Sequence, residues 1–334
     1  MENYLVCVRC MTYNQATFVE KTMNGFCQQE TNFPYVCIIM DDASTDGEPD
    51  VINRFLDLYF DVEGKCIETE HYIQRTGCHK ENRNCHFVVY LLKYNHHGKK
   101  AKQPYYASFY NNAKYIATCE GDDFWTDTNK LQEEVDVLEK NEHVTLVHTA
   151  FDIINEKGDI INAPEALYES IPRRKKEGYL WQDHLVLGTP ILFCTTMYRQ
   201  GSLDTEGPTV DYAQFMGCAR RGEIAYISKK MANYRILNTS QMRTSRRKVT
   251  SRIKDGIFWQ LYFFSRRQYK TDKYYKRNLR TRVLVSEAII SSLLIWYKLT
   301  VPEKNKKLLY ILFLRPLNLL LLPVALMTKI ARRL

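Results

Sequence analysis

The stretch YIATCEGDDFWTDTNKL, residues 115–131, is the most informative part of the chain. Its first five residues, 115–119, form an apolar run that predicts a buried strand, and the run ends abruptly in the acidic turn 120–123. Carboxylates gathered at a strand end repel one another and gain nothing from burial, so a divalent cation between them would explain the cluster. The alternative is a solvated acidic turn that caps a helix starting near Thr128, and the turn alone does not decide between the two.

Strand-like and helix-like segments alternate around this stretch. The expected strands are 5–8, 35–40, 87–92, 115–119 and 144–147, and the expected helices are 16–27, one that follows Gly47, and 131–138. Such alternation predicts an α/β fold with a mostly parallel sheet and helices on both faces. A further strand is expected over 191–198, and the pattern from residue 251 onward predicts a helical C-terminal extension.

Two segments carry more local predictions. In the helix after Gly47, Pro49 fits the first turn. The predicted buried face of that helix comprises Val51, Ile52, Phe55 and Leu58. The segment 61–86 is polar and lacks periodicity, which predicts an inserted loop. Its crowded cysteines and histidines suggest a metal site, but their spacing matches no familiar zinc module, so a loop with incidental thiols is favoured. These residues are His71, Cys78, His79, Cys85 and His86.

Polar clusters follow three of the expected parallel strands. They are Thr12-Tyr13-Asn14, Asp41-Asp42 and the acidic turn 120–123. In parallel α/β sheets ligands bind beyond the carboxyl ends of the strands. The three clusters therefore predict one binding site, although Asp41-Asp42 alone would also fit an ordinary strand-to-helix turn with Ser44 or Asp46 as the N-cap.

These motifs, taken in order, resemble those of the family 2 glycosyltransferases. The resemblance rests on Val6 to Gln15, on Ile38 to Asp46 and on the acidic turn followed by Phe124-Trp125, and it resumes near Asp211 to Arg235. It covers roughly half of the chain. What it implies is a GT-A (Rossmann-like) fold and an inverting transfer of a sugar from a nucleotide diphosphate donor, usually a UDP-sugar, assisted by Mg²⁺ or Mn²⁺.

The resemblance also implies roles for individual residues. Thr12, Tyr13 and Asp41 match positions that hold the nucleotide, with Asn14 and Asp42 beside them, while Asp122 and Asp123 match a metal-binding motif, with Asp122 also on the donor side. That motif begins here with Glu120 where aspartate is commoner, and the longer carboxylate could still reach ribose or metal through water. Lys130 could support the phosphates or simply solvate its helix.

Asp211 is the candidate catalytic base. It opens an expected helix that is followed by a glycine turn, a strand and Tyr234-Arg235, an order similar to the acceptor side of the family. Asp211 could equally cap that helix, and the two roles are compatible. Relatives often place a histidine where this chain has Leu237. His148 and Asp152 could line the acceptor side, although a structural histidine is commoner.

Charge divides the chain into two parts. Residues 242–334 hold 22 Lys and Arg against 4 Asp and Glu, a net charge of +18, whereas residues 1–241 hold 25 against 34, a net charge of −9. Within this basic part, residues 308–327 are apolar and long enough to cross a bilayer, but Arg315, Pro316, Asn318 and Pro323 interrupt them. This pattern favours a helix on an anionic membrane surface over a true span or a docked core helix. Without a recognition motif, nucleic acid is not an expected partner.

The whole sequence predicts a glycosyltransferase domain at 1–240, with a nucleotide-binding half at 1–125 and an acceptor half at 126–240, and a membrane-associating region at 241–334. The expected acceptor is a glycan or lipid-linked hydroxyl, in surface polysaccharide biosynthesis. Ten cysteines without a framework spacing, and a start that lacks signal-peptide features, favour a cytoplasmic location at the inner membrane face. The alternatives are a sugar-phosphate nucleotidyltransferase, disfavoured because no glycine-rich loop follows the first strand, and a non-catalytic membrane-bound scaffold.

Overall fold

A computed structural model describes residues 4–97, 101–161, 191–203, 214–215, 217–218 and 221–237. Apart from residues 214–215, 217–218 and 237, these belong to one compact unit. Asp211 and the whole basic region lie outside the described residues. Among the described residues, no helix combines the length and the apolar character needed to cross a membrane.

The unit is built on one mixed sheet of ten strands in the order β3-β4-β5-β2-β1-β6-β9-β8-β10-β7. The strands are β1 (Val6–Thr12), β2 (Tyr35–Asp41), β3 (Phe60–Glu68), β4 (Tyr72–His79), β5 (Cys85–Leu92), β6 (Tyr115–Thr118), β7 (Phe124–Trp125), β8 (Val144–Ile154), β9 (Thr196–Arg199) and β10 (Glu223–Arg235). The helices are α1 (Val19–Cys27), α2 (Glu48–Tyr59), α3 (Gln103–Asn112) and α4 (Lys130–Lys140), with a 3₁₀ turn over Phe193–Thr195.

The centre of the sheet is parallel. β1 pairs with β2 on one side and with β6 on the other, and β2 pairs in parallel with β5. Every residue of β2 and β5 is buried, as the continuous apolar runs of a doubly covered parallel strand predict. The predicted α/β fold is therefore confirmed.

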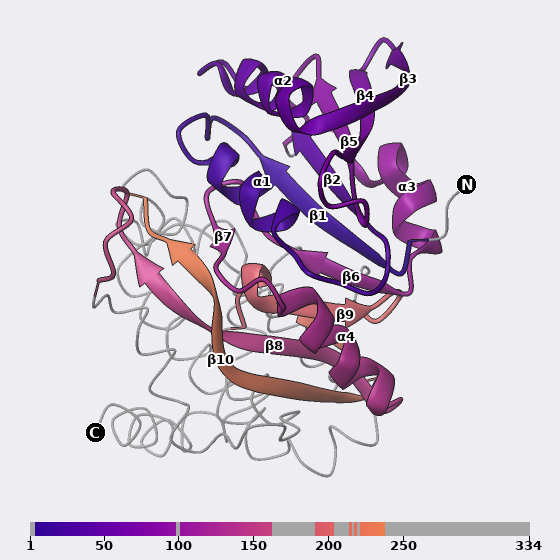
Figure 1. Ribbon diagram of the computed structural model, residues 1–334, viewed down its shortest axis with the longest axis vertical. Coiled ribbons are helices and arrows are strands. Elements are labelled where there is room, and N and C mark those ends of the chain that lie inside the picture. The colour runs from indigo at the N-terminus through magenta and orange to yellow at the C-terminus, as the bar shows by residue number, and fades with distance from the viewer. Residues whose placement is uncertain are drawn as a thin grey trace, which may run out of the picture. The chain divides into compact units, whose positions relative to one another are not determined.

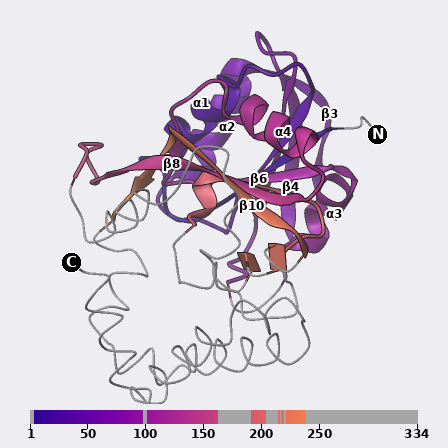
Figure 2. The same ribbon diagram turned by 90° about the horizontal axis from the view of Figure 1, so that it is seen from below.

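Helices cover both faces of the sheet. In Figures 1 and 2, α1, α2 and α4 lie on one face and α3 lies on the other. The first face holds the main apolar core, to which Phe26 of α1, Phe55 of α2 and Leu131 of α4 contribute. α3 was not predicted, because its aromatic and small residues give no apolar stripe and Tyr106 is its one buried residue.

The segment 61–86 is not an inserted loop, so that prediction was wrong. It forms the antiparallel strands β3 and β4, and β4 extends the sheet from β5. The pattern was missed because β3 is an edge strand in which only Phe60 is buried, and an edge strand exposed on both faces shows no apolar alternation.

The buried face of α2 was also predicted with an error. Ile52 and Phe55 are buried as expected, but Leu58 is 59% exposed and Leu56 takes its place in the core. Phe55 and Leu56 follow Ile52 by three and four residues, so these three side chains lie on one face of the helix and Leu58 does not. The strand expected over 191–198 begins only at Thr196, after the 3₁₀ turn.

Candidate functional site

Three loops meet at the carboxyl ends of the central strands. Thr12 and Asp41, the last residues of β1 and β2, are partners in the parallel ladder, and β6 runs beside β1 in the same direction. The loops that follow these strands carry the three polar clusters noted in the sequence. The topology therefore brings together the residues 12–14, 41–42 and 120–123 at one edge of the sheet.

Glu48 joins the first two loops. Its carboxylate accepts hydrogen bonds from the Thr12 hydroxyl, from the Gln15 N–H at 2.8 Å and from the Ser44 hydroxyl at 2.8 Å. Glu48 is fully buried, and burial raises the pKa of its carboxyl group. The Thr12 hydroxyl is thus engaged in a hydrogen bond within the protein, and this bond holds the loop after β1 in place. Sequence reasoning missed Glu48 because an acidic residue in the first turn of a helix usually indicates no more than a favourable dipole interaction.

Asn14 makes the second link between these loops. Its N–H donates to the Ser44 hydroxyl and its side-chain oxygen accepts from the Thr45 N–H, both at 2.8 Å. Asn14 and Ala43 both have left-handed backbone angles, with φ of 53° and 61°. This conformation costs a residue with a β-carbon about 1–2 kcal/mol, so the surrounding bonds hold the loops in a strained shape. Tyr13, between these anchors, is 48% exposed and presents its ring at the edge of the sheet.

Asp41 and Asp42 differ in how their charges are balanced. Asp41 is fully buried and accepts a hydrogen bond from the Ser44 N–H at 3.1 Å, and burial raises its pKa. Asp42 forms an ion pair with Lys102 at 2.7 Å and accepts the His96 N–H at 2.7 Å. Asp42 therefore ties the loop after β5 and the start of α3 to the site, which the sequence did not reveal because these partners lie more than fifty residues away.

The acidic turn is packed tightly against the loop after β1. The Thr22 hydroxyl of α1 lies 2.9 Å from the Gly121 carbonyl oxygen and 2.5 Å from that of Asp123. A β-carbon at Gly121 would overlap the Thr12 hydroxyl and lie 2.6 Å from the Gln15 side-chain oxygen, so only glycine permits this approach. Glu120 is exposed, Asp122 is half-buried and Asp123 is buried.

Arg235, at the end of β10, holds the acidic turn from the other side. Its N–H donates to an Asp123 carboxylate oxygen at 2.8 Å, and its guanidinium donates to the Asp122 carbonyl at 2.9 Å. The guanidinium carbon lies 4.5 Å from the centre of the Phe18 ring. The structure thus places one residue of the predicted Tyr234-Arg235 pair in direct contact with the predicted metal motif.

The two aspartates of the acidic turn both have raised pKa values. Burial raises the pKa of Asp122 despite the opposing effect of Arg235. Burial and then the charge of Asp122 raise the pKa of Asp123 well above its usual range, and Glu120 adds to this. Carboxylate oxygens are the ligands that Mg²⁺ and Mn²⁺ prefer, so the donor chemistry of this pair suits such a cation.

Arg9 is a further cation near this turn. Burial lowers its pKa, but the phenols of Tyr198, Tyr106 and Tyr110, together with Glu120, outweigh that effect and raise it. Arg9 projects from β1, and its guanidinium carbon lies 5.5 Å from the centre of the Phe193 ring. A single arginine within an apolar strand has no sequence pattern of its own, which is why it was missed.

Three other predicted residues have structural partners. Lys130 neither solvates its helix nor is presented to a ligand, because it is fully buried and forms an ion pair with Glu134 at 2.6 Å. His148 is buried beside Tyr226, with ring centres 4.9 Å apart. Asp152 is ion-paired with Lys230.

No protein-family model matches the chain. It is 27% identical over 229 residues to uncharacterized proteins of Mycobacterium bovis and Mycobacterium tuberculosis, a match that covers 67% of this chain and 57% of theirs. The chain therefore spans little more than half the length of these relatives.

Among solved structures, the mannosyltransferase PcManGT from Pyrobaculum calidifontis, in complex with GDP-Man and Mn²⁺, has 14% sequence identity and a TM-score of 0.52 over 89% of this chain and 72% of its own. S. aureus TarS in complex with UDP has 12% identity over 86% of this chain and 70% of its own, with a TM-score of 0.48 that is too low to establish a shared fold. The first of these similarities supports the predicted GT-A-like α/β fold.

Proposed function

We propose that this protein is a metal-assisted, inverting glycosyltransferase that moves a sugar from a nucleotide diphosphate-sugar to a hydroxyl group. The observation that carries the proposal is the acidic turn, because Asp122 and Asp123 follow β6 at the carboxyl edge of the parallel strands, beside the loops after β1 and β2. Arg235 and Thr22 fix the backbone of the turn, so its carboxylates are held in place before any ligand arrives.

The nucleotide would bind over the loops after β1 and β2. The exposed ring of Tyr13 offers a surface for stacking a base, and Asp41 lies at the adjacent strand end. Thr12 and Asn14 would act by shaping these loops, since both are engaged in bonds across them. The structural neighbour from Pyrobaculum calidifontis binds GDP-Man with Mn²⁺, which supports a nucleotide-sugar with a divalent cation as the ligand class. We propose a UDP-sugar on the basis of the family resemblance.

The chemistry follows from the charge of the leaving group. As the bond between sugar and phosphate breaks, negative charge gathers on the departing diphosphate. A cation bound by Asp122 and Asp123 would supply electrostatic stabilisation of that charge. On the opposite face of the sugar the attacking hydroxyl needs a base, and we propose Asp211 for that role. Glu120, the first residue of the turn, is exposed and could reach the ribose or the cation through water.

The acceptor and the location belong to the same proposal. A glycan or lipid-linked acceptor, polysaccharide biosynthesis and a peripheral position on the inner face of the membrane are supported by the composition of residues 241–334, whose basic and apolar side chains suit an anionic membrane surface. We assign residues 1–240 to the catalytic domain, divided into a donor half (1–125) and an acceptor half (126–240).

A panel of nucleotide-sugars tested by thermal shift, with and without Mn²⁺, examines the donor assignment. A donor at 100 times its Kd should stabilise the folded protein by about 2.7 kcal/mol. Asp122→Asn should abolish the Mn²⁺-dependent part of the shift, whereas Asp136→Asn, on the exposed face of α4, should leave it unchanged. A panel without any Mn²⁺-dependent shift would refute the proposal.

A transfer assay then separates catalysis from binding. Asp211→Asn should keep the thermal shift with the donor but lower the transfer rate by about 10²–10⁴-fold, the usual contribution of a general base. Transfer at the wild-type rate by a folded Asp211→Asn variant would contradict the assignment of the base while leaving the donor site intact.

A further inference from the structure

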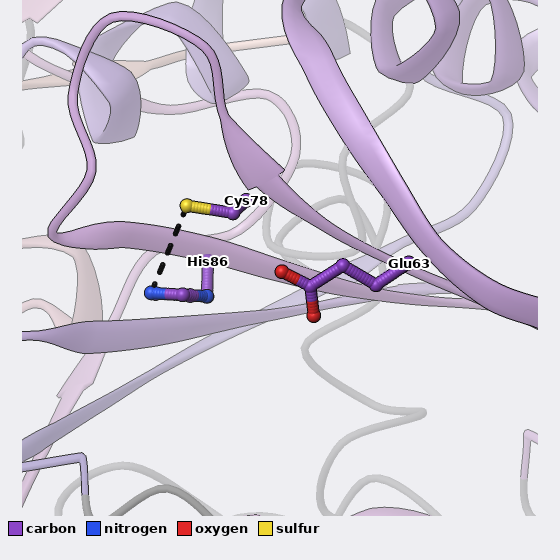
Figure 3. A group of neighbouring side chains, drawn as sticks. All are labelled: Glu63, Cys78 and His86. Carbon is purple, nitrogen blue, oxygen red and sulfur yellow. Dashed lines mark hydrogen bonds between the residues drawn. The ribbon is translucent and has the colours of Figure 1, made fainter.

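A second candidate metal site lies at the other end of the sheet. Among the described residues, Glu63, Cys78 and His86 form the one group of three His, Cys, Asp or Glu residues whose potential ligand atoms all lie within 4.8 Å of one another. Figure 3 shows the three side chains converging from β3, β4 and β5. The inference does not depend on the proposed function, because none of these residues belongs to the acidic turn.

The sheet register explains why these side chains share one face. Cys78 of β4 is paired with His86 of β5 and with Asp61 of β3, and directly paired antiparallel residues project to the same side. Glu63 is two residues beyond Asp61 on β3 and therefore projects to that side as well. The ladder thus brings one thiol, one imidazole and one carboxylate to a single spot.

The other thiols and imidazoles of this region are directed elsewhere. His79 packs edge-on against Phe60 and accepts the Asn82 N–H at 2.9 Å. Cys85 lies against Cys27 and Cys37 on the core side of the sheet. Of the five residues that suggested a metal site in the sequence, only Cys78 and His86 come together, and Glu63 is the ligand that the sequence did not indicate.

The distance between Cys78 and His86 suits a tetrahedral ion. The Cys78 sulfur lies 3.9 Å from the His86 Nε2. A zinc ion with bonds of about 2.3 Å to sulfur and about 2.05 Å to nitrogen would hold these atoms about 3.6 Å apart, so a shift of a few tenths of an ångström brings this pair to zinc-binding geometry. Cys78 and His86 are buried, whereas Glu63 is exposed and can adjust its long side chain.

The surroundings favour a cation and hold the imidazole in place. The Tyr4 ring packs against the His86 ring, with centres 5.0 Å apart. Asp61, in the same cross-strand row, forms an ion pair with Arg83 at 2.7 Å, so this arginine is already matched by a carboxylate. Glu63 then adds negative charge beside the thiol, and binding of a cation would release the thiol proton to solvent.

We propose that Glu63, Cys78 and His86 bind Zn²⁺, with water in the fourth position, and that the ion ties the edge strand β3 to β4 and β5. A thiolate with an imidazole selects zinc over magnesium and manganese, whose preferred ligands are oxygens. His86 is the second residue of β5, at the opposite end of that strand from the loop that contacts Asp42. This ion is therefore distinct from the cation proposed for the acidic turn.

Titration of the full, reduced chain with Co²⁺ tests the site through the absorption of a thiolate–cobalt bond. The near-ultraviolet band should appear in the wild type, persist in excess Mg²⁺ and disappear when Zn²⁺ is added. It should be absent in Cys78→Ser and retained in Cys66→Ser, which removes an exposed thiol from the neighbouring strand β3. Loss of the band with Cys66→Ser, or its retention with Cys78→Ser, would overturn the proposal.

Glu63→Gln gives a second test that does not disturb the buried thiol. Because Glu63 is exposed, this variant should fold normally and bind Co²⁺ at least tenfold more weakly than the wild type. Zn²⁺ should raise the melting temperature of the wild type by several degrees and that of Cys78→Ser not at all. Wild-type Co²⁺ affinity in Glu63→Gln, or displacement of Co²⁺ by Mg²⁺, would contradict the proposed ligand set.

Discussion

Asp123→Asn should make the ligand-free protein more stable while removing its proposed metal-dependent activity. Burial and the charge of Asp122 raise the pKa of the Asp123 carboxyl group, so its ionised form is unfavourable in the folded protein. The amide oxygen of asparagine can still accept the Arg235 N–H, which now lies 2.8 Å from the carboxylate, so the variant keeps that hydrogen bond and loses the charge. Removing the possibility of a buried charge at this position is expected to stabilise the ligand-free protein by about 0.5–2 kcal/mol.

The sign of the pH dependence follows from linkage. A raised pKa means that the folded protein binds the Asp123 proton more tightly than the unfolded chain does. Lowering the pH through the folded-state pKa therefore stabilises the wild type, until the unfolded chain is protonated as well. The advantage of Asp123→Asn should accordingly be largest at alkaline pH and should shrink on acidification.

Urea unfolding at several pH values, with and without donor and Mn²⁺, measures both effects. Without ligand the variant should have the higher midpoint. With a saturating donor the order should reverse, because only the wild type gains the stabilisation of about 2.7 kcal/mol expected at 100 times the Kd. Asp136→Asn, on the exposed face of α4, should behave like the wild type throughout. A ligand-free Asp123→Asn protein that is less stable than the wild type, and that still responds to Mn²⁺, would refute the reasoning.

Two further predictions test the packing around the site. Gly121→Ala should lower the free energy of unfolding in urea by about 1–3 kcal/mol, because its β-carbon would overlap the Thr12 hydroxyl. It should also abolish the thermal shift with the donor. Unchanged stability would show that the loops move aside without cost. Glu134→Gln should lower the free energy of unfolding by about 3–5 kcal/mol, because it leaves the buried Lys130 without a counter-charge. The double variant Lys130→Met with Glu134→Leu removes both charges and should leave the stability unchanged or raise it. Equal losses in the single and double variants would show that packing, and not the uncompensated charge, determines the cost.

The central strands and the position of the site could be predicted because they depend on local patterns. β2 and β5 are continuous apolar runs, and the carboxyl ends of parallel strands lie at one edge of the sheet. These two patterns are enough to predict that the acidic turn lies beside the loops after β1 and β2, as it does in the fold.

The roles of Glu48, Lys130 and Glu134 were not predicted from the sequence, because they depend on the three-dimensional packing. Glu48 is indistinguishable in sequence from any acidic residue at a helix start, yet it accepts bonds from the loop after β1. Lys130 and Glu134 are spaced like an ordinary surface pair on a helix, yet both are fully buried. The strand β3 was missed for a different, local reason: most of its side chains are exposed, so its sequence shows no apolar alternation.

The polar residues at the edge of the sheet differ in whether their charges are balanced, and this difference points to their roles. Asp42 has Lys102 and the His96 N–H, while Glu48 receives three hydrogen bonds from the loops it joins. Burial raises the pKa of Glu48 as well, whereas burial together with the charges of Asp122 and Glu120 raises the pKa of Asp123 well above its usual range. Repulsion between neighbouring carboxylates costs stability, and a bound cation would offset that cost. Asp42 and Glu48 therefore hold the loops in shape, and Asp122 and Asp123 are the pair that we propose binds the cation.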